Sequence, residues 1–120
     1  MAAKMFYDDD ADLSLLDGKK VAIIGYGIQG RAQSLCLRDS GVDVIIAELK
    51  GTPNYEQAVA DGWDIQDTES AAKAADMIQV LTQDHLQAMV FKNFILPNLS
   101  EGNALIFSHG FNIRFGGIVP

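Results

Sequence analysis

The chain of 120 residues has little cysteine, little positive charge and no long apolar run. Its one cysteine, Cys36, excludes an internal disulfide and suits a reducing cytoplasm. The net charge of −7, without a basic cluster, argues against binding to nucleic acid or to an anionic membrane surface. No apolar run approaches a membrane span, and the first residues lack the apolar core of a signal peptide. The sequence therefore predicts a soluble, cytoplasmic globular domain.

Residues that commonly hold metals are also sparse. The two histidines, His85 and His109, lie far apart in the sequence, which makes a weak case for zinc. The acidic residues between positions 8 and 12 show no ligand spacing and are interpreted as a solvated arm. We expect no metal site in this chain.

A glycine motif lies between a short apolar run and a helical pattern near the start of the chain. Val21 to Ile24 form a short apolar run, typical of a buried strand, and Gly25, Gly27 and Gly30 follow in G-x-G-x-x-G spacing. A helical pattern comes next. Strand, glycines and helix in this order are what a dinucleotide-binding turn requires, because the free N–H groups at the helix start face the pyrophosphate. The alternative is a glycine-rich turn without a ligand.

Further apolar runs and helical patterns alternate along the chain. Strands are expected at 21–24, 42–47, 63–65, 76–81 and 104–107, and helices after Gly30 and at 54–60, 68–75 and 84–98. This alternation predicts an α/β, Rossmann-type doubly wound sheet with parallel central strands in three αβα layers. The predicted core contains Val21, Ile23, Val44, Ile46, Ile78, Val80, Leu105 and Phe107. Ala32, Leu35 and Cys36 are expected on the packed face of the first helix, with Cys36 as a small core residue.

Ligands of such sheets lie at the carboxyl ends of the strands. Glu48 closes the second strand, near the usual offset for an acid that accepts from the ribose hydroxyls and repels a 2′-phosphate. Lys50 and Thr52 favour the opposite preference, for a cofactor with a 2′-phosphate, since a cation and a hydroxyl can hold a phosphate. Glu48 can also be interpreted as a solvated loop acid.

His109 follows the fifth strand at the same edge, among loop residues. A histidine there transfers protons or polarises a carbonyl near the nicotinamide. A purely structural role is the alternative. His85 falls in the first turn of a helix, where a cation is unfavourable.

Taken together, these residues resemble the N-terminal domain of ketol-acid reductoisomerase. The resemblance covers essentially the whole chain, including FYDDDADLSLLDGKKVAIIGYGIQGRAQS, DSGVDV, LTQDHLQ and SHGFNI before FGGIVP. Members of this family reduce and isomerise acetohydroxy acids in branched-chain amino-acid synthesis, with NADPH or NADH and two magnesium ions. The family's metal carboxylates lie in a later helical domain. The resemblance implies that residues 1–120 are the cofactor domain alone, without that domain and not competent in catalysis.

The resemblance also implies roles for individual residues. Tyr26, Gly27, Ile28 and Gln29 would line the pyrophosphate, and Leu49 and Thr52 would face the adenosine ribose. The segment from Asp84 to Gln87 would border the cofactor, and His109 would be the active-site histidine.

Several positions depart from the family pattern. GYGSQGH is GYGIQGR here, so Ile28 lacks a hydroxyl and Arg31 replaces a histidine, and His85 replaces an acid. The cofactor-loop arginine aligns with Leu49, beside Glu48, which favours NADH over NADPH.

The helix at 84–98 has large apolar side chains around nearly its whole axis, whereas a helix in this fold should keep one wet face. Either a later domain covers it in a longer protein, or the surface of an isolated domain was redesigned as an interface. The joint departures at Ile28, Arg31, His85 and Phe94 favour redesign. A second functional hypothesis is therefore a binding or self-assembling scaffold, with a homodimer centred on Met89 and Phe94.

Overall fold

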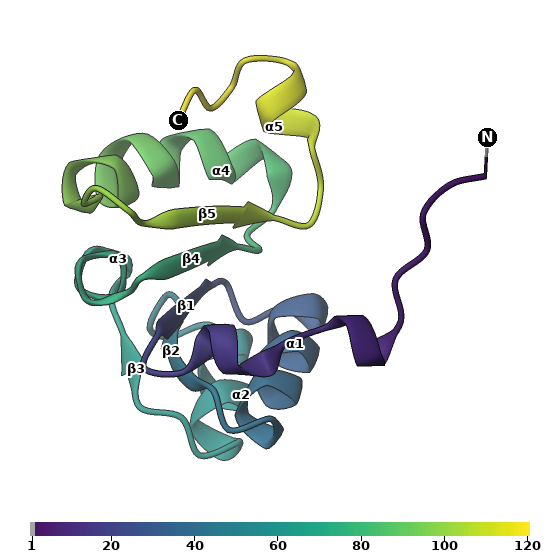
Figure 1. The fold of residues 1–120 in the computed structure, drawn as a ribbon. Coiled ribbons are helices and arrows are strands. Elements are labelled where there is room, and N and C mark those ends of the chain that lie inside the picture. The colour runs from purple at the N-terminus through teal and green to yellow at the C-terminus, as the bar shows by residue number, and fades with distance from the viewer. Residues whose placement is uncertain (1) are drawn as a thin grey trace.

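The fold is built on one parallel sheet, seen in a computed structural model that describes residues 2–120. The sheet has five strands in the order β3-β2-β1-β4-β5 (Figure 1). The strands are β1 (Lys20–Ile24), β2 (Asp43–Ala47), β3 (Ile65–Gln66), β4 (Met77–Val80) and β5 (Ala104–Phe107). Every neighbouring pair is parallel. The order reverses between β1 and β4, so this pair marks the switch point at which such sheets bind ligands.

Helices cover the two faces of the sheet. The helices and shorter helical turns are η1 (Asp8–Asp10), η2 (Leu13–Leu16), α1 (Ile28–Asp39), α2 (Pro53–Ala60), α3 (Thr68–Ala74), α4 (Asp84–Val90), η3 (Phe91–Ile95), η4 (Leu96–Asn98) and α5 (Phe111–Arg114). One face packs against α1 and α2, and the other packs against α3 and the α4–η3 run (Figure 1). The predicted doubly wound α/β fold is confirmed. Among residues 2–120, no helix is long and apolar enough to cross a membrane.

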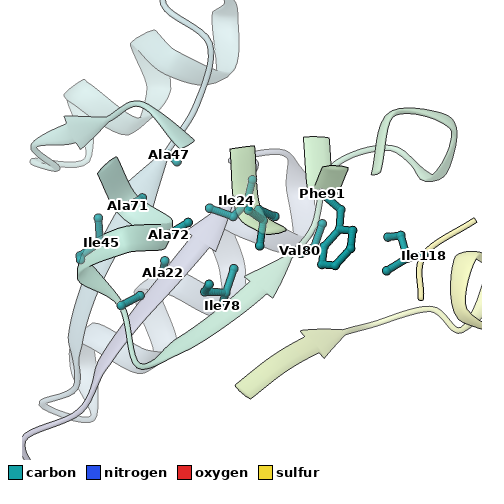
Figure 2. Packing of buried hydrophobic residues seen from close by; sticks show 12 residues of the cluster. Ala22, Ile24, Ile45, Ala47, Ala71, Ala72, Ile78, Val80, Phe91 and Ile118 are labelled. Carbon is teal, nitrogen blue, oxygen red and sulfur yellow. The ribbon is translucent and has the colours of Figure 1, made fainter. Parts of the chain in front are cut away.

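The core divides into two layers, because parallel strands in this fold are covered on both sides. The layer under α3 and η3 is shown in Figure 2, where Phe91 lies between Val80 and Ile118. Of the predicted core residues, five are buried: Val21, Ile23, Ile46, Ile78 and Val80. The other three, Val44, Leu105 and Phe107, pack against the core but stay half-buried. Leu105 and Phe107 lie on β5, an edge strand with a strand neighbour on one side only.

The packed face of α1 differs from the prediction. Cys36 is exposed, and so is Ala32. The buried positions are Gly30 and Ser34. Gly30 sets this register, since it must lie directly against the glycine turn, and the residue four positions later then faces the sheet. Cys36 follows Ser34 by two residues, about 200° around the helix, and therefore points to solvent.

The third strand is also shifted from the prediction. It covers Ile65 and Gln66 and pairs with β2, whereas Trp63 precedes it. The indole of Trp63 instead packs against the core layer under α1 and α2. The strand predicted at 63–65 is therefore right for Ile65, which begins β3, and wrong for Trp63.

The predicted helix at 84–98 is continuous but changes its winding. It passes from α4 through a π-helical turn, η3, into the 3₁₀ turn η4 that contains Pro97. Phe91 and Ile95, four residues apart in this turn, are both buried in the core. Met89, Phe94 and Leu96 are left 48%, 39% and 47% exposed, so the apolar outer face expected from the sequence is present.

Candidate functional site

The carboxyl ends of β1, β2 and β4 meet at Gly25. The Gly25 N–H donates to the carbonyl of Ala47 at 2.9 Å, at the end of β2. The Leu81 N–H donates to the carbonyl of Ile24 at 2.8 Å, which joins the end of β4 to the same turn. The glycine turn is thus fixed at the switch point by both neighbouring strands.

Two glycines of the motif are required by close contacts. Gly25 has a φ of +102°, and a Cβ there would lie 3.0 Å from the backbone nitrogen of Thr82. A Cβ on Gly30 would lie 2.0 Å from the carbonyl oxygen of Gly25. Gly27 is different, because a Cβ there would meet nothing within 4 Å. Gly27 therefore borders open space rather than protein.

That open space lies at the N-terminus of α1. Gly27 is the N-cap of this helix, which runs for 12 residues. The first N–H groups of a helix have no partner within it and carry partial positive charge, so they attract a phosphate. Ile28 is 92% exposed and Gln29 is exposed, so neither side chain is held by the protein. The turn thus fits a dinucleotide pyrophosphate, and contact by these residues stays a prediction.

Glu48 is held rigidly beside this turn. Its Oε2 accepts from the Tyr26 N–H at 2.7 Å, and its Oε1 accepts from the Leu49 N–H at 2.8 Å. The side chain is half-buried. Each carboxylate oxygen keeps a further acceptor site, so the group can still accept hydroxyl protons. This geometry favours a ribose-binding acid over a freely solvated loop acid.

The loop after Glu48 offers little to hold a phosphate. Leu49 is 71% exposed and Lys50 is exposed. The Thr52 hydroxyl caps α2, since it accepts from the Tyr55 N–H at 3.2 Å and donates to the Leu49 carbonyl at 2.7 Å. The Thr52 hydroxyl is thus already hydrogen-bonded within the loop. Of the two phosphate-binding candidates, this leaves the exposed ammonium group of Lys50.

The side chain of Tyr26 points into the protein. It is 1% exposed, and its hydroxyl donates to Asp61 Oδ2 at 2.7 Å while accepting from Trp63 Nε1 at 2.8 Å. Burial, and then the hydrogen bond to Asp61, raise the pKa of the Tyr26 phenol above its ordinary value. Tyr26 therefore can line the pyrophosphate only through its backbone.

Asp61 gathers the side chains around Tyr26. Its carboxylate accepts from Arg31 Nε at 2.7 Å and from Gln57 Nε2 at 3.1 Å. The Arg31 guanidinium first, and then the Tyr26 hydroxyl, hold the pKa of the Asp61 carboxyl well below its usual range. Arg31 thus makes a structural ion pair that fixes α1 to the end of α2.

Buried side-chain hydrogen bonds hold the segment after β4 in place. Gln87 is buried, and its Nε2 donates to the Thr82 carbonyl at 2.8 Å. Asn112, also buried, donates to the Gln87 Oε1 at 3.0 Å and to the Asp84 carbonyl at 2.8 Å. The Gln87 side chain is occupied by these contacts, whereas the Asp84 side chain is exposed. Cofactor contact at both positions stays a prediction.

His109 lies just beyond β5, on an exposed segment. Its Nδ1 accepts from the Phe111 N–H at 3.3 Å, which leaves Nε2 as the other ring nitrogen for a ligand. Ser108, beside it, accepts from Gln33 of α1 at 3.5 Å. His85 is exposed in the first turn of α4. Among residues 2–120, no three His, Cys, Asp or Glu side chains are grouped so as to hold a metal ion.

Sequence reasoning missed the Asp61 and Asn112 contacts. Asp61 lies 35 residues from Tyr26, and Asn112 lies 25 residues from Gln87. Neither belongs to a local motif. Only the topology, which places α1 and α2 on the same face of the sheet and α5 against α4, would have suggested them.

The fold and the glycine turn together define a Rossmann dinucleotide-binding domain. Residues 15–120 match the family model for acetohydroxy acid isomeroreductase, NADPH-binding domain. The chain therefore belongs to the family of ketol-acid reductoisomerases, as the NADPH-binding domain.

Similar sequences and a similar solved structure lead to the same family. The chain is 54% identical over 118 residues to the ketol-acid reductoisomerase (NADP(+)) of Kineococcus radiotolerans, covering 98% of this chain and 34% of that protein. It is 52% identical over its full length to the enzyme of the same name from Mycobacterium sp. strain KMS, of which it covers 36%. The solved NADH-preferring ketol-acid reductoisomerase from an uncultured archean superposes with a TM-score of 0.93 at 42% identity, covering 98% of this chain and 37% of that one. The chain thus spans about a third of the length of these relatives.

Proposed function

We propose that this chain binds a nicotinamide dinucleotide as the cofactor-binding part of ketol-acid reductoisomerase. The observation that carries the proposal is the open space at Gly27, above the unpartnered N–H groups of α1. Residues 25–30 would hold the pyrophosphate there. The adenosine ribose would lie toward Glu48, and the nicotinamide half would lie toward Asp84 and His109.

Binding is tested by titrating the chain with NADH while following Trp63, the one tryptophan in the sequence. Its Nε1 lies 2.8 Å from the Tyr26 hydroxyl, so it reports on the glycine turn. We expect saturable quenching at micromolar NADH. A folded chain whose Trp63 emission, corrected for the light that NADH absorbs, stays unchanged up to millimolar NADH contradicts the proposal.

We further propose that the site prefers NADH. The Glu48 carboxylate is fixed 2.7 Å from the Tyr26 nitrogen, and it repels a 2′-phosphate at the position where it binds ribose hydroxyls. Leu49 offers no charge to offset this repulsion, which leaves the exposed Lys50 as the cation of this loop. The Leu49→Arg variant, at a 71% exposed position, should shift the ratio of NADPH to NADH affinity about tenfold toward NADPH. Leu49→Gln is the uncharged control, and an equal shift in both variants would contradict the electrostatic explanation.

The ketol-acid reductoisomerase reaction would need metal ligands in addition to this domain. Two magnesium ions would polarise substrate oxygens, and a proton would be held or moved at His109 Nε2. Because residues 2–120 offer no grouped metal ligands, we expect no turnover by the 120-residue chain. NAD(P)H oxidation by the pure chain with 2-acetolactate and magnesium would contradict this expectation.

The second candidate function, a self-assembling scaffold, is favoured by the outer face of the α4–η3–η4 run. Met89, Phe94 and Leu96 are each more than a third exposed. Because these side chains are already half-buried, burying the rest against a second copy contributes about 1 kcal/mol each, less the cost of association. We expect a homodimer at tens of micromolar that Phe94→Glu weakens. Sedimentation that shows a monomer, or a dimer indifferent to Phe94→Glu, contradicts the dimer.

A further inference from the structure

The hydroxyl of Thr82 is an unpaired polar group at the switch point. Among the side chains of residues 2–120, its Oγ1 is the buried polar atom that has no hydrogen-bond partner. An unpaired buried hydroxyl costs free energy, so such groups are rare unless a ligand or water satisfies them. This one requires an explanation that packing does not supply.

The position of Thr82 connects it to the glycine turn. Its backbone nitrogen would lie 3.0 Å from a Cβ on Gly25, so the two backbones are in direct contact. Its carbonyl accepts from Gln87 Nε2, and Gln87 is held in turn by Asn112. The backbone of Thr82 is therefore fixed by buried contacts, whereas its hydroxyl is not used by them.

Thr82 also lies on a definite side of the switch point. Glu48, at the end of β2, marks the half of the sheet proposed to hold the adenosine. Thr82 follows β4, across β1 from β2, on the half that leads to His109. A dinucleotide whose pyrophosphate lies at Gly27 has two riboses, one on each half. The ribose nearest Thr82 is the one that carries the nicotinamide.

We propose that Thr82 is a cofactor-binding residue whose hydroxyl hydrogen-bonds a hydroxyl of the nicotinamide-side ribose. The inference rests on the proposed dinucleotide binding. The residue as a whole is half-buried, so its exposed area belongs to atoms other than Oγ1. A rotation about the Cα–Cβ bond brings the hydroxyl to the ligand and sacrifices no hydrogen bond, because Oγ1 has none in the free chain.

Three ligands that differ by one chemical group test this assignment in the full chain. ADP contains the adenosine and the diphosphate, ADP-ribose adds the second ribose, and NADH adds the nicotinamide. The variant is Thr82→Val, which removes the hydroxyl but keeps the shape, and the control is Thr82→Ser, which keeps a hydroxyl. We expect Thr82→Val to weaken ADP-ribose and NADH binding about tenfold and to leave ADP binding unchanged. Thr82→Ser should stay close to wild type for all three ligands.

A second measurement needs no ligand. Because Thr82→Val removes an unsatisfied buried hydroxyl, the free variant should melt about 2–6 °C higher than wild type. A lower Tm would show that the hydroxyl has a partner in the free chain, which overturns the inference.

The outcomes separate this inference from the proposed function. A folded wild-type chain that binds none of the three ligands overturns both. Wild-type binding of ADP-ribose that Thr82→Val leaves unchanged overturns the role of Thr82 alone. Equal weakening of ADP and ADP-ribose overturns the ribose assignment, because ADP lacks that ribose.

Discussion

Single residues of the glycine turn divide into those that shape the protein and those that leave room for a ligand. Gly25 and Gly30 belong to the first kind, because added Cβ atoms would meet backbone at 3.0 Å and 2.0 Å. Gly27 belongs to the second kind, since nothing in the protein lies within 4 Å of an added Cβ. The G-x-G-x-x-G spacing predicted all three positions, but only the structure separates their roles.

A pair of alanine substitutions checks this division. Gly30→Ala forces its Cβ against the Gly25 carbonyl oxygen, so the free energy of unfolding should fall by about 2 kcal/mol or more. Gly27→Ala should stay within about 0.5 kcal/mol of wild type in urea denaturation, yet weaken NADH binding at least about tenfold. Gly27→Ala that binds NADH normally would show that the open space is not the pyrophosphate site.

Asp61 makes the stability of the chain depend on pH in the acid range. Its carboxyl keeps its charge to lower pH in the folded chain than in the unfolded chain, because Arg31 and Tyr26 stabilise the anion. The stabilisation is therefore complete above the unfolded pKa, about 3.9, and is lost as the pH falls below it. The Asp61→Asn variant should lose stability at pH 7 and show a shallower decline as the pH falls from about 4 to about 2 in denaturant titrations. Tyr26→Phe, which removes one donor, should lie between the two, and equal slopes in all three proteins would contradict this origin.

At the scale of elements, apolar runs and helical patterns predicted the parallel strands and the helices between them. They did not predict the π turn of η3, because the winding there depends on which side chains reach the core. They also failed on the packed face of α1, where the contact between Gly30 and Gly25 outweighs the apolar pattern of Ala32 and Cys36. Both failures arise from tertiary contacts that a linear pattern does not contain.

The π turn leads to a prediction for two adjacent residues. Ile95 is 0% exposed in the layer under α3, whereas its neighbour Phe94 is 39% exposed. Ile95→Ala should lower the free energy of unfolding by about 2–5 kcal/mol, and Phe94→Ala by less than about 1 kcal/mol. Urea denaturation at low micromolar concentration measures both. The opposite ranking would show that Phe94, and not Ile95, faces the core.

At the scale of the whole molecule, the switch point organises the candidate site. The ends of β1, β2 and β4 bring together Gly25, Glu48 and Thr82, which lie far apart in the sequence. Because parallel strands end at one edge, the sequence was enough to predict that Glu48 and the segment from Leu81 to Gln87 lie at this edge. The unpaired buried hydroxyl of Thr82 could not be predicted, since it depends on the packing around it.

The central claim, that this chain is a dinucleotide-binding domain, is tested most directly by calorimetric titration of the 120-residue chain with NADH and with NADPH. The account predicts one site per chain, micromolar affinity for NADH, weaker affinity for NADPH, and NADH affinity at least about tenfold lower in Gly27→Ala. Circular dichroism of the same sample establishes that the chain is folded. A folded chain that binds neither cofactor would contradict the claim and favour the scaffold function.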